Sequence, residues 1–468
     1  MTAMFGLPRR TLSLAAIAGV AVGIVYALSP LTVCFAIAIL LLFRWTVSGI
    51  EGDERRWIMT MLIVALALRI VAIAALFVTT DHAKVPFGSL FGDEEYFIKR
   101  SIWLRNVALG LSVHGADVIY AFDDYSATSY LYVLAFVQVL VGPAQYGVHL
   151  LGMGFYLTAS VILYRLVRST LGVMPALIGI GVLLFLPSLF AWSISALKEP
   201  LYFLLTASSV ALAVKVARGP GWGIRMLAAV LIMAIAGALQ TVRSAGAGLS
   251  AASVAGGLAI GAIITRPRLL LPIVVATPLA VGAVFSRPRV QYQAYTVLQN
   301  AARQHWGHVA TPGYVYRILD DRFYPDKSEI NDMQFAEATR FAVRSFQRYL
   351  TVPLPWEVRS ASALAFLPEQ IVWYLVIALL PFGVVFAFRR DAIVAGLLFG
   401  HAAVAAVTVA LISGNIGTLV RHRGLALPYL VWLSAVGACE LVERWRRYAL
   451  DRAASPPQPP HFTRTEAI

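Results

Sequence analysis

The sequence predicts an all-α polytopic membrane protein with about a dozen transmembrane helices. Of the 468 residues, 59% are hydrophobic and only 13% are charged, whereas soluble globular chains carry about 25% charged residues. Apolar runs of about 20 residues, long enough to cross the hydrocarbon core, recur along almost the whole chain. The net charge of +14 does not call for a nucleic-acid partner, because many of the basic residues lie just beyond these runs, as the positive-inside rule describes.

The apolar runs are expected to be helices, because backbone polar groups in hydrocarbon must be hydrogen-bonded within the segment. Arg9 and Arg10 precede the first run as in a signal peptide. No small-residue cleavage site follows, so we expect a retained helix. The predicted spans are 11–28, 30–47, 57–80, 146–167, 173–191, 197–217, 223–243, 245–265, 269–286, 367–388, 391–412 and 424–443.

Basic residues orient these spans. With the spans above, the clusters of Lys and Arg fall on one side of the membrane, which is therefore the cytoplasmic side and holds both termini. The apolar stretch 130–142 would invert this pattern if it crossed, so we expect a helix along the outer interface there. The clusters are Arg9 and Arg10; Arg44, Arg55 and Arg56; Arg165 and Arg168; Lys215, Arg218 and Arg225; Arg266 and Arg268; Arg389 and Arg390; and Arg444, Arg446 and Arg447.

The predicted topology divides the chain into consecutive regions. Two outer-face loops, an acidic one and a later one rich in charge and aromatic residues, are expected to contain interfacial helices. The polar, Pro-rich C-terminal end is expected to be a disordered cytoplasmic tail. The regions are 1–56, with two transmembrane helices and a cytoplasmic loop; 57–286, a transmembrane core that includes the acidic outer loop 81–146; 287–366, the second outer loop; 367–443, the C-terminal transmembrane helices; and 444–468, the tail.

The first candidate functional residues are in the acidic outer loop. Asp93, Glu94 and Glu95 are followed by Tyr96. Adjacent carboxylates can divide the work of a site, one serving as a base while the other binds a cation or orients the first. A divalent cation at Asp93 and Glu94 is left open. The alternative is a solvated helix start, since acids favour helix N-termini.

Further candidates stand at the outer ends of later spans. Lys198 and Glu199 either bind a ligand or anchor a helix end by snorkelling. Arg243 faces away from the positive side, where arginine is unusual, which favours a functional role. Since ionisable residues at a membrane are costly, each such residue is a candidate by default.

The segment 414–423 leads into the last span and combines a Gly-rich backbone with two arginines. Asn415, Arg421 and Arg423 there suit a phosphate or pyrophosphate site near a helix N-terminus. A basic patch that binds lipid headgroups is the alternative. All these segments fall on the outer side, which predicts an outward-facing site in which acids deprotonate an acceptor and cations hold an anionic lipid leaving group.

Other conspicuous residues give little indication of a functional site. His305 and His308 lack the further ligands of a zinc site. Cys34 and Cys439 lie inside predicted spans and form no disulfide framework. Arg69, in the middle of a span, is interpreted as a buried structural arginine. The sequence contains no Walker loop, nucleophile elbow or dinucleotide-binding motif.

Residues 57–210 resemble the GT-C membrane glycosyltransferases that use polyprenyl-phosphate sugars. The likeness rests on the Arg-containing span 57–80 followed by the GDEEY motif at 92–96, on the SYLY stretch at 129–132 ending in Val141 and Gly142, and on the turn at 164–172. This turn is similar to that of bacterial members related to protein mannosyltransferases and lipid A aminoarabinose transferase. The resemblance implies a GT-C-like fold.

The resemblance also implies roles for the candidate residues. An acidic residue of the first outer loop is the catalytic base in this family, which corresponds to Asp93 here, with Glu94 beside it. Donor phosphate is bound by basic residues on later outer segments, which correspond in placement to Lys198, Arg243, Arg421 and Arg423.

The resulting hypothesis is an inverting glycosyltransferase of the bacterial inner membrane with a periplasmic active site. It would move a sugar from a polyprenyl-phosphate donor to a lipid-linked glycan or cell-envelope acceptor, as in polysaccharide biosynthesis. Two alternatives stay open. One is an O-antigen-type polysaccharide polymerase or ligase, which would use a lipid-diphosphate donor. The other is a lipid or solute transporter or flippase, although transporters usually place their charges at mid-membrane.

Overall fold

The computed structural model describes residues 8–85, 90–91, 93–123, 128–143, 146–311, 314–358 and 367–454. These residues are mostly helical, and they contain no β-strand. The helices are α1 (Arg9–Leu28), α2 (Pro30–Val47), α3 (Gly52–Thr79), α4 (Glu94–Ala108), α5 (Gly115–Ala121), α6 (Ser129–Val141), α7 (Gly147–Thr170), α8 (Val173–Phe185), α9 (Pro187–Ser193), α10 (Glu199–Arg218), α11 (Trp222–Val242), α12 (Gly246–Ile264), α13 (Pro267–Phe285), α14 (Pro288–Ala310), η2 (Asp321–Phe323), η3 (Lys327–Asp332), α15 (Phe335–Thr351), η4 (Pro355–Glu357), α17 (Leu367–Arg390), α18 (Ala392–Ile412), α19 (Ile416–Arg423) and α20 (Leu427–Ala454).

Among the described residues, eight helices are long and apolar enough to cross a membrane, or up to ten if each of two bent helix pairs is one span. The chain is therefore a multi-pass membrane protein, as predicted, but the predicted number of about a dozen spans is not confirmed. The difference lies in the predicted spans 11–28 and 269–286. These two stretches form α1 and α13, which have 20 and 19 residues.

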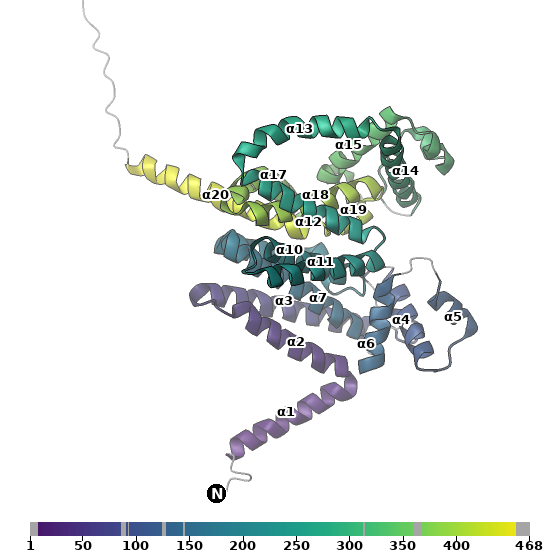
Figure 1. Cartoon of the computed structure of the whole chain (residues 1–468). Helices are drawn as coiled ribbons and strands as arrows, with labels where there is room; N and C mark the ends of the chain where they lie inside the picture. The colour runs from purple at the N-terminus through teal and green to yellow at the C-terminus, as the bar shows by residue number, and fades with distance from the viewer. Residues whose placement is uncertain are drawn as a thin grey trace, which may run out of the picture.

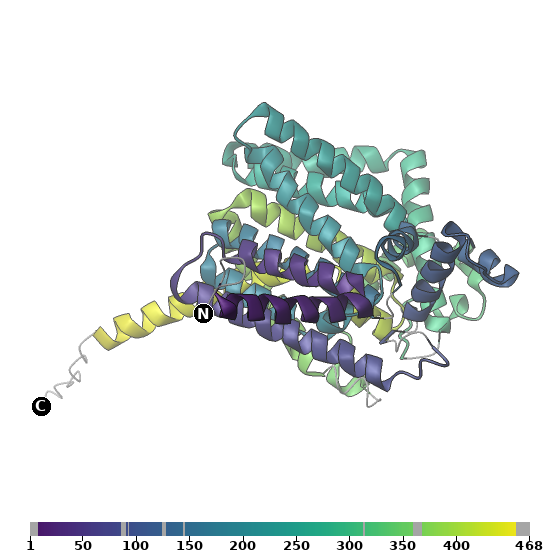
Figure 2. The same ribbon diagram turned by 90° about the horizontal axis from the view of Figure 1, so that it is seen from below.

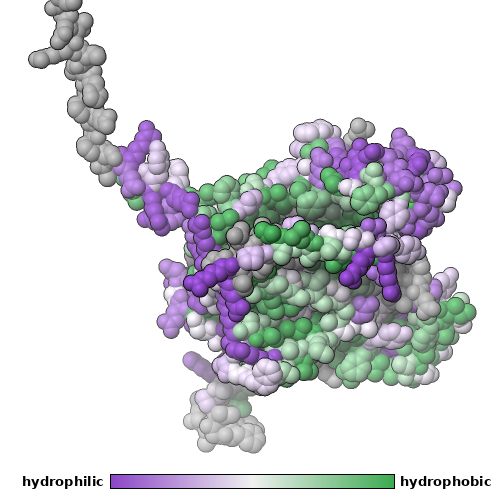
Figure 3. Space-filling model, turned by 45° about the horizontal axis from the view of Figure 1, so that its top comes forward, coloured by the Kyte–Doolittle hydropathy of each residue, from purple (hydrophilic) through white to green (hydrophobic). Residues whose placement is uncertain are grey.

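The long helices run between two ends of the molecule (Figure 1). One end, here called the loop end, is formed by α4, α5, α6, α14, α15 and α19. At the opposite end, α1 begins and α20 ends, so the first and last described helices share one end (Figures 1 and 2). We call it the basic end, because Arg168, Arg218 and Arg390 form their ion pairs there. A broad hydrophobic surface separates the hydrophilic residues over α14 and α15 from those over the end of α20 (Figure 3).

The charge pattern predicts that the stretch 130–142 does not cross the membrane. In the structure this stretch belongs to α6, which lies at the loop end beside α4. The helix has 13 residues and is therefore roughly 20 Å long, shorter than the hydrocarbon core. It ends at Gly142, whose φ of 81° lies in the left-handed region that favours glycine. The length of α6 agrees with a helix that does not cross.

The predicted span 173–191 is broken into α8 and α9, which are bent by 68°. Pro187 has no N–H, so the carbonyl of Leu183 loses its helical donor. The Tyr156 hydroxyl donates to this carbonyl at 2.8 Å instead. The break is thus compatible with an apolar environment, because a side chain replaces the missing backbone bond.

Buried Arg69 satisfies another backbone group of the same break. Its Nη2 donates to the carbonyl of Leu184 at 3.0 Å, and its Nε donates to the Ser193 hydroxyl at 2.7 Å. Nη1 donates to the carbonyl of Ala65 in its own helix at 3.1 Å. Arg69 is therefore the buried structural arginine that the sequence predicts.

Close packing of α12 on α18 brings distant segments together at the loop end. A Cβ atom added at Gly257 would lie 2.7 Å from the carbonyl oxygen of Gly396, and one at Gly400 would lie 2.8 Å from that of Ser253. Small residues spaced four apart allow two membrane helices to approach closely. Because α12 follows Arg243 and α18 leads into α19, this contact brings Arg243 toward α19.

Some predicted features differ or lie outside the described residues. Helix α20 continues to Ala454, so residues 444–454 are helical where a disordered tail is predicted. The predicted span ends at 443, but the following residues RWRRYALDRAA contain no Gly or Pro, and Arg447 pairs with Glu443 one turn earlier, so the helix continues. Residues 455–468, Gly92 of the acidic motif and 359–366 of the second outer loop lie outside the described residues.

Candidate functional site

Residues from the separate predicted segments meet at the loop end. Nη1 of Arg421, in α19, lies 3.0 Å from Oδ2 of Asp93, which precedes α4. Nη2 of the same guanidinium lies 3.7 Å from Oε1 of Glu199 at the start of α10. The charges of Asp93, Glu199, Arg243 and Arg421 all act on the amine of Lys198. These five residues are called the cationic cluster below.

Within the cluster, Asp93 is the open group. Its side chain is 63% exposed, whereas that of Arg421 is 23% exposed. The Arg421 guanidinium also lies over the ring of Phe91, 5.2 Å from its centroid, a cation–π contact that limits its movement. The site therefore joins a carboxylate that a ligand can reach to an arginine held between two acids and an aromatic ring.

Lys198 and Arg243 complete the positive side of the cluster. Burial lowers the pKa of Lys198, and Arg243 and Arg421 lower it further, whereas Glu199 and Asp93 raise it. Arg243 follows α11, and its guanidinium lies 5.9 Å from the ring centroid of Tyr202. A partly desolvated amine beside two guanidinium groups gains from an anionic ligand, because such a ligand relieves both repulsion and desolvation.

Glu94 has a different place from Asp93, although the two are adjacent. Its side chain is 0% exposed. Oε1 accepts hydrogen bonds from the amides of Leu90 and Phe91 at 3.0 and 2.8 Å, and Oε2 accepts one from the amide of Ala196 at 3.0 Å. Nε2 of buried His149, which sequence reasoning missed, is 3.3 Å from Oε2. Glu94 thus ties the acidic loop to the segment before α10.

This arrangement bears on the divalent cation considered for Asp93 and Glu94. Amide donors occupy both oxygens of Glu94. Glu95 is ion-paired with Lys99. Across the described part of the chain, no group of three or more His, Cys, Asp and Glu residues could hold a metal ion.

Tyr96 also serves the architecture of the loop end. Its hydroxyl accepts a hydrogen bond from Arg100, whose guanidinium lies 4.7 Å from the Tyr96 ring centroid. Nη2 of Arg100 donates to the carbonyls of Ala121 and Asp123 at 3.1 and 2.6 Å. The pair therefore connects α4 to the end of α5.

Asn415 fixes the start of α19. Its Oδ1 accepts hydrogen bonds from the amides of Gly417 and Thr418 at 2.8 and 3.4 Å, which caps the helix. Asn415 also forms a β-bridge with Val315, which attaches α19 to the second outer loop. It therefore positions Arg421 through the helix that it caps.

Arg423 does not join the cationic cluster. It lies two residues after Arg421, roughly 200° away around the helix, and is 4% exposed. Nη1 donates to Oε1 of Gln370 at 3.0 Å, Nε donates to the carbonyl of Tyr349 at 3.1 Å, and Nη2 donates to the carbonyls of Tyr349 and Val352. Its donors are engaged in joining α19 to α15 and α17.

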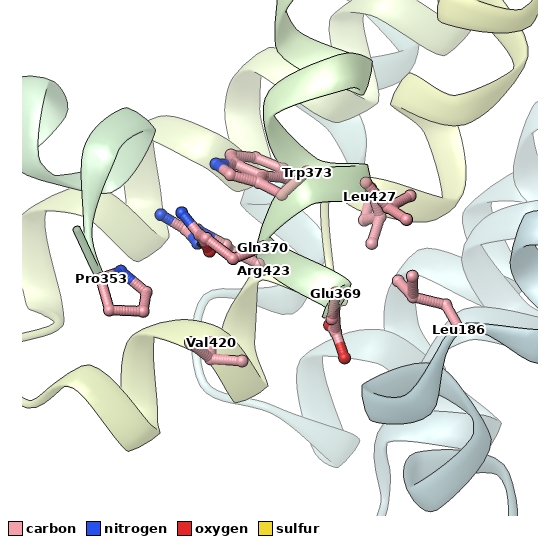
Figure 4. Close-up of a pocket in the computed structure, with 9 residues that line it drawn as sticks. Leu186, Pro353, Glu369, Gln370, Trp373, Val420, Arg423 and Leu427 are labelled. Carbon is pink, nitrogen blue, oxygen red and sulfur yellow. Dashed lines mark hydrogen bonds between the residues drawn. The ribbon is translucent and has the colours of Figure 1, made fainter. Parts of the chain in front are cut away.

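A small pocket of about 380 Å³, including space open to solvent, lies on this second side of α19 (Figure 4). Trp373, Gln370 and Arg423 lie close together in Figure 4, and Glu369 accepts from the amide of Ser188 at 2.8 Å, just after the break before α9. The lining residues are Leu186, Pro353, Glu369, Gln370, Val372, Trp373, Val420, Arg423 and Leu427.

Three unpaired buried atoms lie together in and beside the cationic cluster. Nε of Arg421, Oε2 of Glu199 and Nδ1 of the neighbouring His422 are buried and have no hydrogen-bond partner among the described residues. Buried polar atoms normally have partners, so this group of atoms marks a place for a ligand or water. Sequence reasoning missed His422, and its only signal is its place between two arginines.

The fold and the site define a multi-pass membrane protein with a cation-rich site at one end of its helices. Comparison of the chain with protein-family models, with curated proteins and with solved structures gives no match.

Proposed function

We propose that the protein is an inverting membrane glycosyltransferase with a GT-C-like fold, which transfers a sugar from a polyprenyl-phosphate donor to a lipid-linked glycan or cell-envelope acceptor. The observation that carries the proposal is the contact of 3.0 Å between exposed Asp93 and Arg421. It joins a carboxylate that can accept a proton to a cation that can hold a phosphate. Both groups are needed at one point when a hydroxyl displaces a phosphate.

In the proposed reaction, Asp93 takes the proton of the acceptor hydroxyl while its oxygen attacks the anomeric carbon. The bond from this carbon to the phosphate oxygen breaks, and the electron pair leaves with the polyprenyl phosphate. Arg421, Arg243 and Lys198 stabilise the negative charge that develops on the phosphate. A single displacement of this kind inverts the configuration at the anomeric carbon.

The charges of the cationic cluster support a monophosphate donor. Arg243, Arg421 and Lys198 face the carboxylates of Asp93 and Glu199, which leaves an excess of one positive charge. A glycosyl phosphodiester carries one negative charge and balances this excess. After transfer, Asp93 is protonated and the departing phosphate is doubly charged, so the balance persists. A diphosphate donor, as a polymerase or ligase would use, brings an additional negative charge.

The distribution of charge also favours an enzyme over a transporter. Transporters bind their substrates near mid-membrane, between broken helices. Here the deep charge in α3, Arg69, is engaged by Ser193, Ala65 and Leu184 beside such a break. The clustered charges of Asp93, Lys198, Glu199, Arg243 and Arg421 lie instead at the loop end.

In this proposal the basic end faces the cytoplasm of a bacterium, and the loop end faces the periplasm. The support is the positive-inside rule applied to the basic clusters. Both termini are then cytoplasmic, and the acceptor approaches Asp93 from the periplasm.

Ligand-induced stabilisation of the detergent-solubilised full chain tests the phosphate site. A polyprenyl phosphate is expected to raise the melting temperature, whereas the matching polyprenyl alcohol is not, because a ligand stabilises only a state that binds it. Arg421→Ala should abolish the difference between the two lipids. The matched control is Arg289→Ala, an exposed arginine of α14 outside the cluster, which should retain it. Equal shifts with phosphate and alcohol in the wild type would contradict the proposal.

A further inference from the structure

We propose that His422 is a further ligand of the donor phosphate and acts as a neutral hydrogen-bond donor. The inference rests on the proposed function, and it adds a residue that selects a singly charged phosphodiester. It starts from Nδ1 of His422, which is buried and has no partner among the described residues. A neutral imidazole that carries its proton on Nδ1 can donate from that atom.

The neighbours of His422 identify the ligand as an anion. The charged and titratable groups that act on its imidazole are Arg243 after α11, Arg421 in α19, His308 in α14 and Lys198 before α10. The acids of the site, Asp93 and Glu199, contact Arg421. Nδ1 of His422 has no hydrogen-bond partner among the described residues although cations surround the imidazole, so an anion bound by these cations is its natural partner.

Burial, and then the same neighbours, keep His422 neutral. Protonation would add a positive charge beside Arg243, Arg421 and Lys198, and like charges disfavour the charged form. Nδ1 of His308 is directed to the carbonyl of Ile412 at 2.7 Å and therefore carries the proton of that bond. His422 thus supplies a donor without changing the excess of one positive charge that matches a phosphodiester.

Helix α19 holds His422 in place independently of the ligand. Asn415 caps the start of the helix, and the saturated side chain of Arg423 fixes its end to Tyr349 and Gln370. His422 lies between Arg421, which ligands can reach, and Arg423, which they cannot. The imidazole therefore needs no bond of its own to be preorganised.

Calorimetric titration of the full-length protein tests the inference. The probe is a methyl polyprenyl phosphodiester, whose charge is constant between pH 6 and 8, and dimethyl phosphate tests whether free phosphodiester suffices. Wild-type protein should bind the lipid diester with the same affinity at pH 6 and 8. The measured binding enthalpy should not depend on the ionisation enthalpy of the buffer, which shows that binding takes up no proton. Dimethyl phosphate should bind at least tenfold more weakly, and equal affinity would overturn the assignment to a lipid-linked phosphate.

Substitution separates a ligand from a structural residue. His422→Leu should weaken binding of the lipid diester about 10- to 100-fold, the effect of one hydrogen bond to a charged group. His422→Gln, which keeps an N–H donor, should restore most of the affinity. His114→Leu, an exposed histidine elsewhere at the loop end, is the matched control and should bind as the wild type does.

The outcomes distinguish the two proposals. Failure of wild-type protein to bind the diester at either pH would refute the phosphate site and the proposed function with it. Two results would overturn the role of His422 as a neutral donor and leave the proposed function standing. One is binding that is unaffected by His422→Leu. The other is proton uptake on binding that occurs in the wild type and is absent in His422→Gln.

Discussion

At the basic end, arginines are matched individually with carboxylates. Arg218 makes two hydrogen bonds of 2.6 Å to the carboxylate of Asp391, which also caps α18. Arg168 binds both carboxylate oxygens of Glu54. At the loop end, one guanidinium, that of Arg421, stands between Asp93 and Glu199 with Lys198 and Arg243 nearby.

The difference teaches how to separate structural from ligand-binding charges in a membrane protein. Bidentate pairs at the basic end satisfy their groups and join helices that are distant in sequence. The cationic cluster leaves Nε of Arg421 and Oε2 of Glu199 buried without partners. Since such atoms cost free energy when unpaired, they indicate where the molecule gains from a ligand.

The largest expected effect sets an acid of the loop end against one of the basic end. Asp93→Asn should lower the transfer rate about 100- to 10,000-fold, because it removes the general base. Its melting temperature should change little, since the side chain is 63% exposed. Asp391→Asn should instead lower the melting temperature and leave transfer per folded molecule intact. A donor-dependent transfer assay and thermal unfolding measure both. Full transfer by Asp93→Asn would refute its role as the base.

A sharper comparison uses two arginines of the same short helix. Arg423→Gln should destabilise the protein by about 3 kcal/mol, because it leaves the carbonyls of Tyr349 and Val352 buried without donors. Arg421→Gln should cost less than about 1 kcal/mol, since its pair with Asp93 is partly exposed, yet it should remove selective stabilisation by polyprenyl phosphate. Thermal unfolding with and without the lipid measures both effects. Similar losses of stability in the two variants would erase the contrast.

The smallest effect concerns pH at the loop end. Burial lowers the pKa of His305 in α14 to about 4, and Nδ1 and Nε2 lie 3.1 and 3.2 Å from the Ser413 carbonyl and the Tyr324 hydroxyl. A histidine with a lowered pKa stabilises the folded state above its ordinary pKa of 6.5, and this stability is lost as the pH falls toward 4. Between pH 7 and 5.5 the loss should be about 1 kcal/mol.

Hydrogen–deuterium exchange of α14 at pH 7 and 5.5, corrected for the intrinsic pH dependence of exchange, measures this loss. Exchange in α14 should accelerate on acidification, whereas exchange at the basic end around α18 should not. His305→Gln, which cannot titrate, should remove the pH dependence. The same acceleration in this variant would assign the effect to another group.

Sequence reasoning predicts the site in part because charge near a membrane is informative by itself. Asp93, Lys198, Glu199, Arg243 and Arg421 are all candidates from their positions at span ends, and the structure brings them together. Residue type could not separate Asp93 from Glu94, because the distinction is one of orientation. Adjacent residues at a helix start point in different directions, and here Glu94 turns inward to three amides.

Arg423 and His422 make the same point from the other side. The RHR pattern suggests two equivalent arginines and gives the histidine no role. In the folded protein, α19 presents Arg423 to the carbonyls after α15, while Arg421 faces the acidic loop. Arg421 and Arg423 differ in role because each contacts residues that are distant in the sequence. No local sequence pattern predicts these contacts.

By itself, the sequence determined that this protein is helical and crosses the membrane many times, since the length and composition of apolar runs suffice for that. It also determined which ionisable residues stand at the ends of those runs. Only the tertiary structure decided which charges are saturated, because saturation depends on backbone carbonyls and amides that helix breaks and packing expose. The bend before α9, the approach of α12 to α18 and the cap of α19 together decide that Arg421, rather than Arg423, remains available to a ligand.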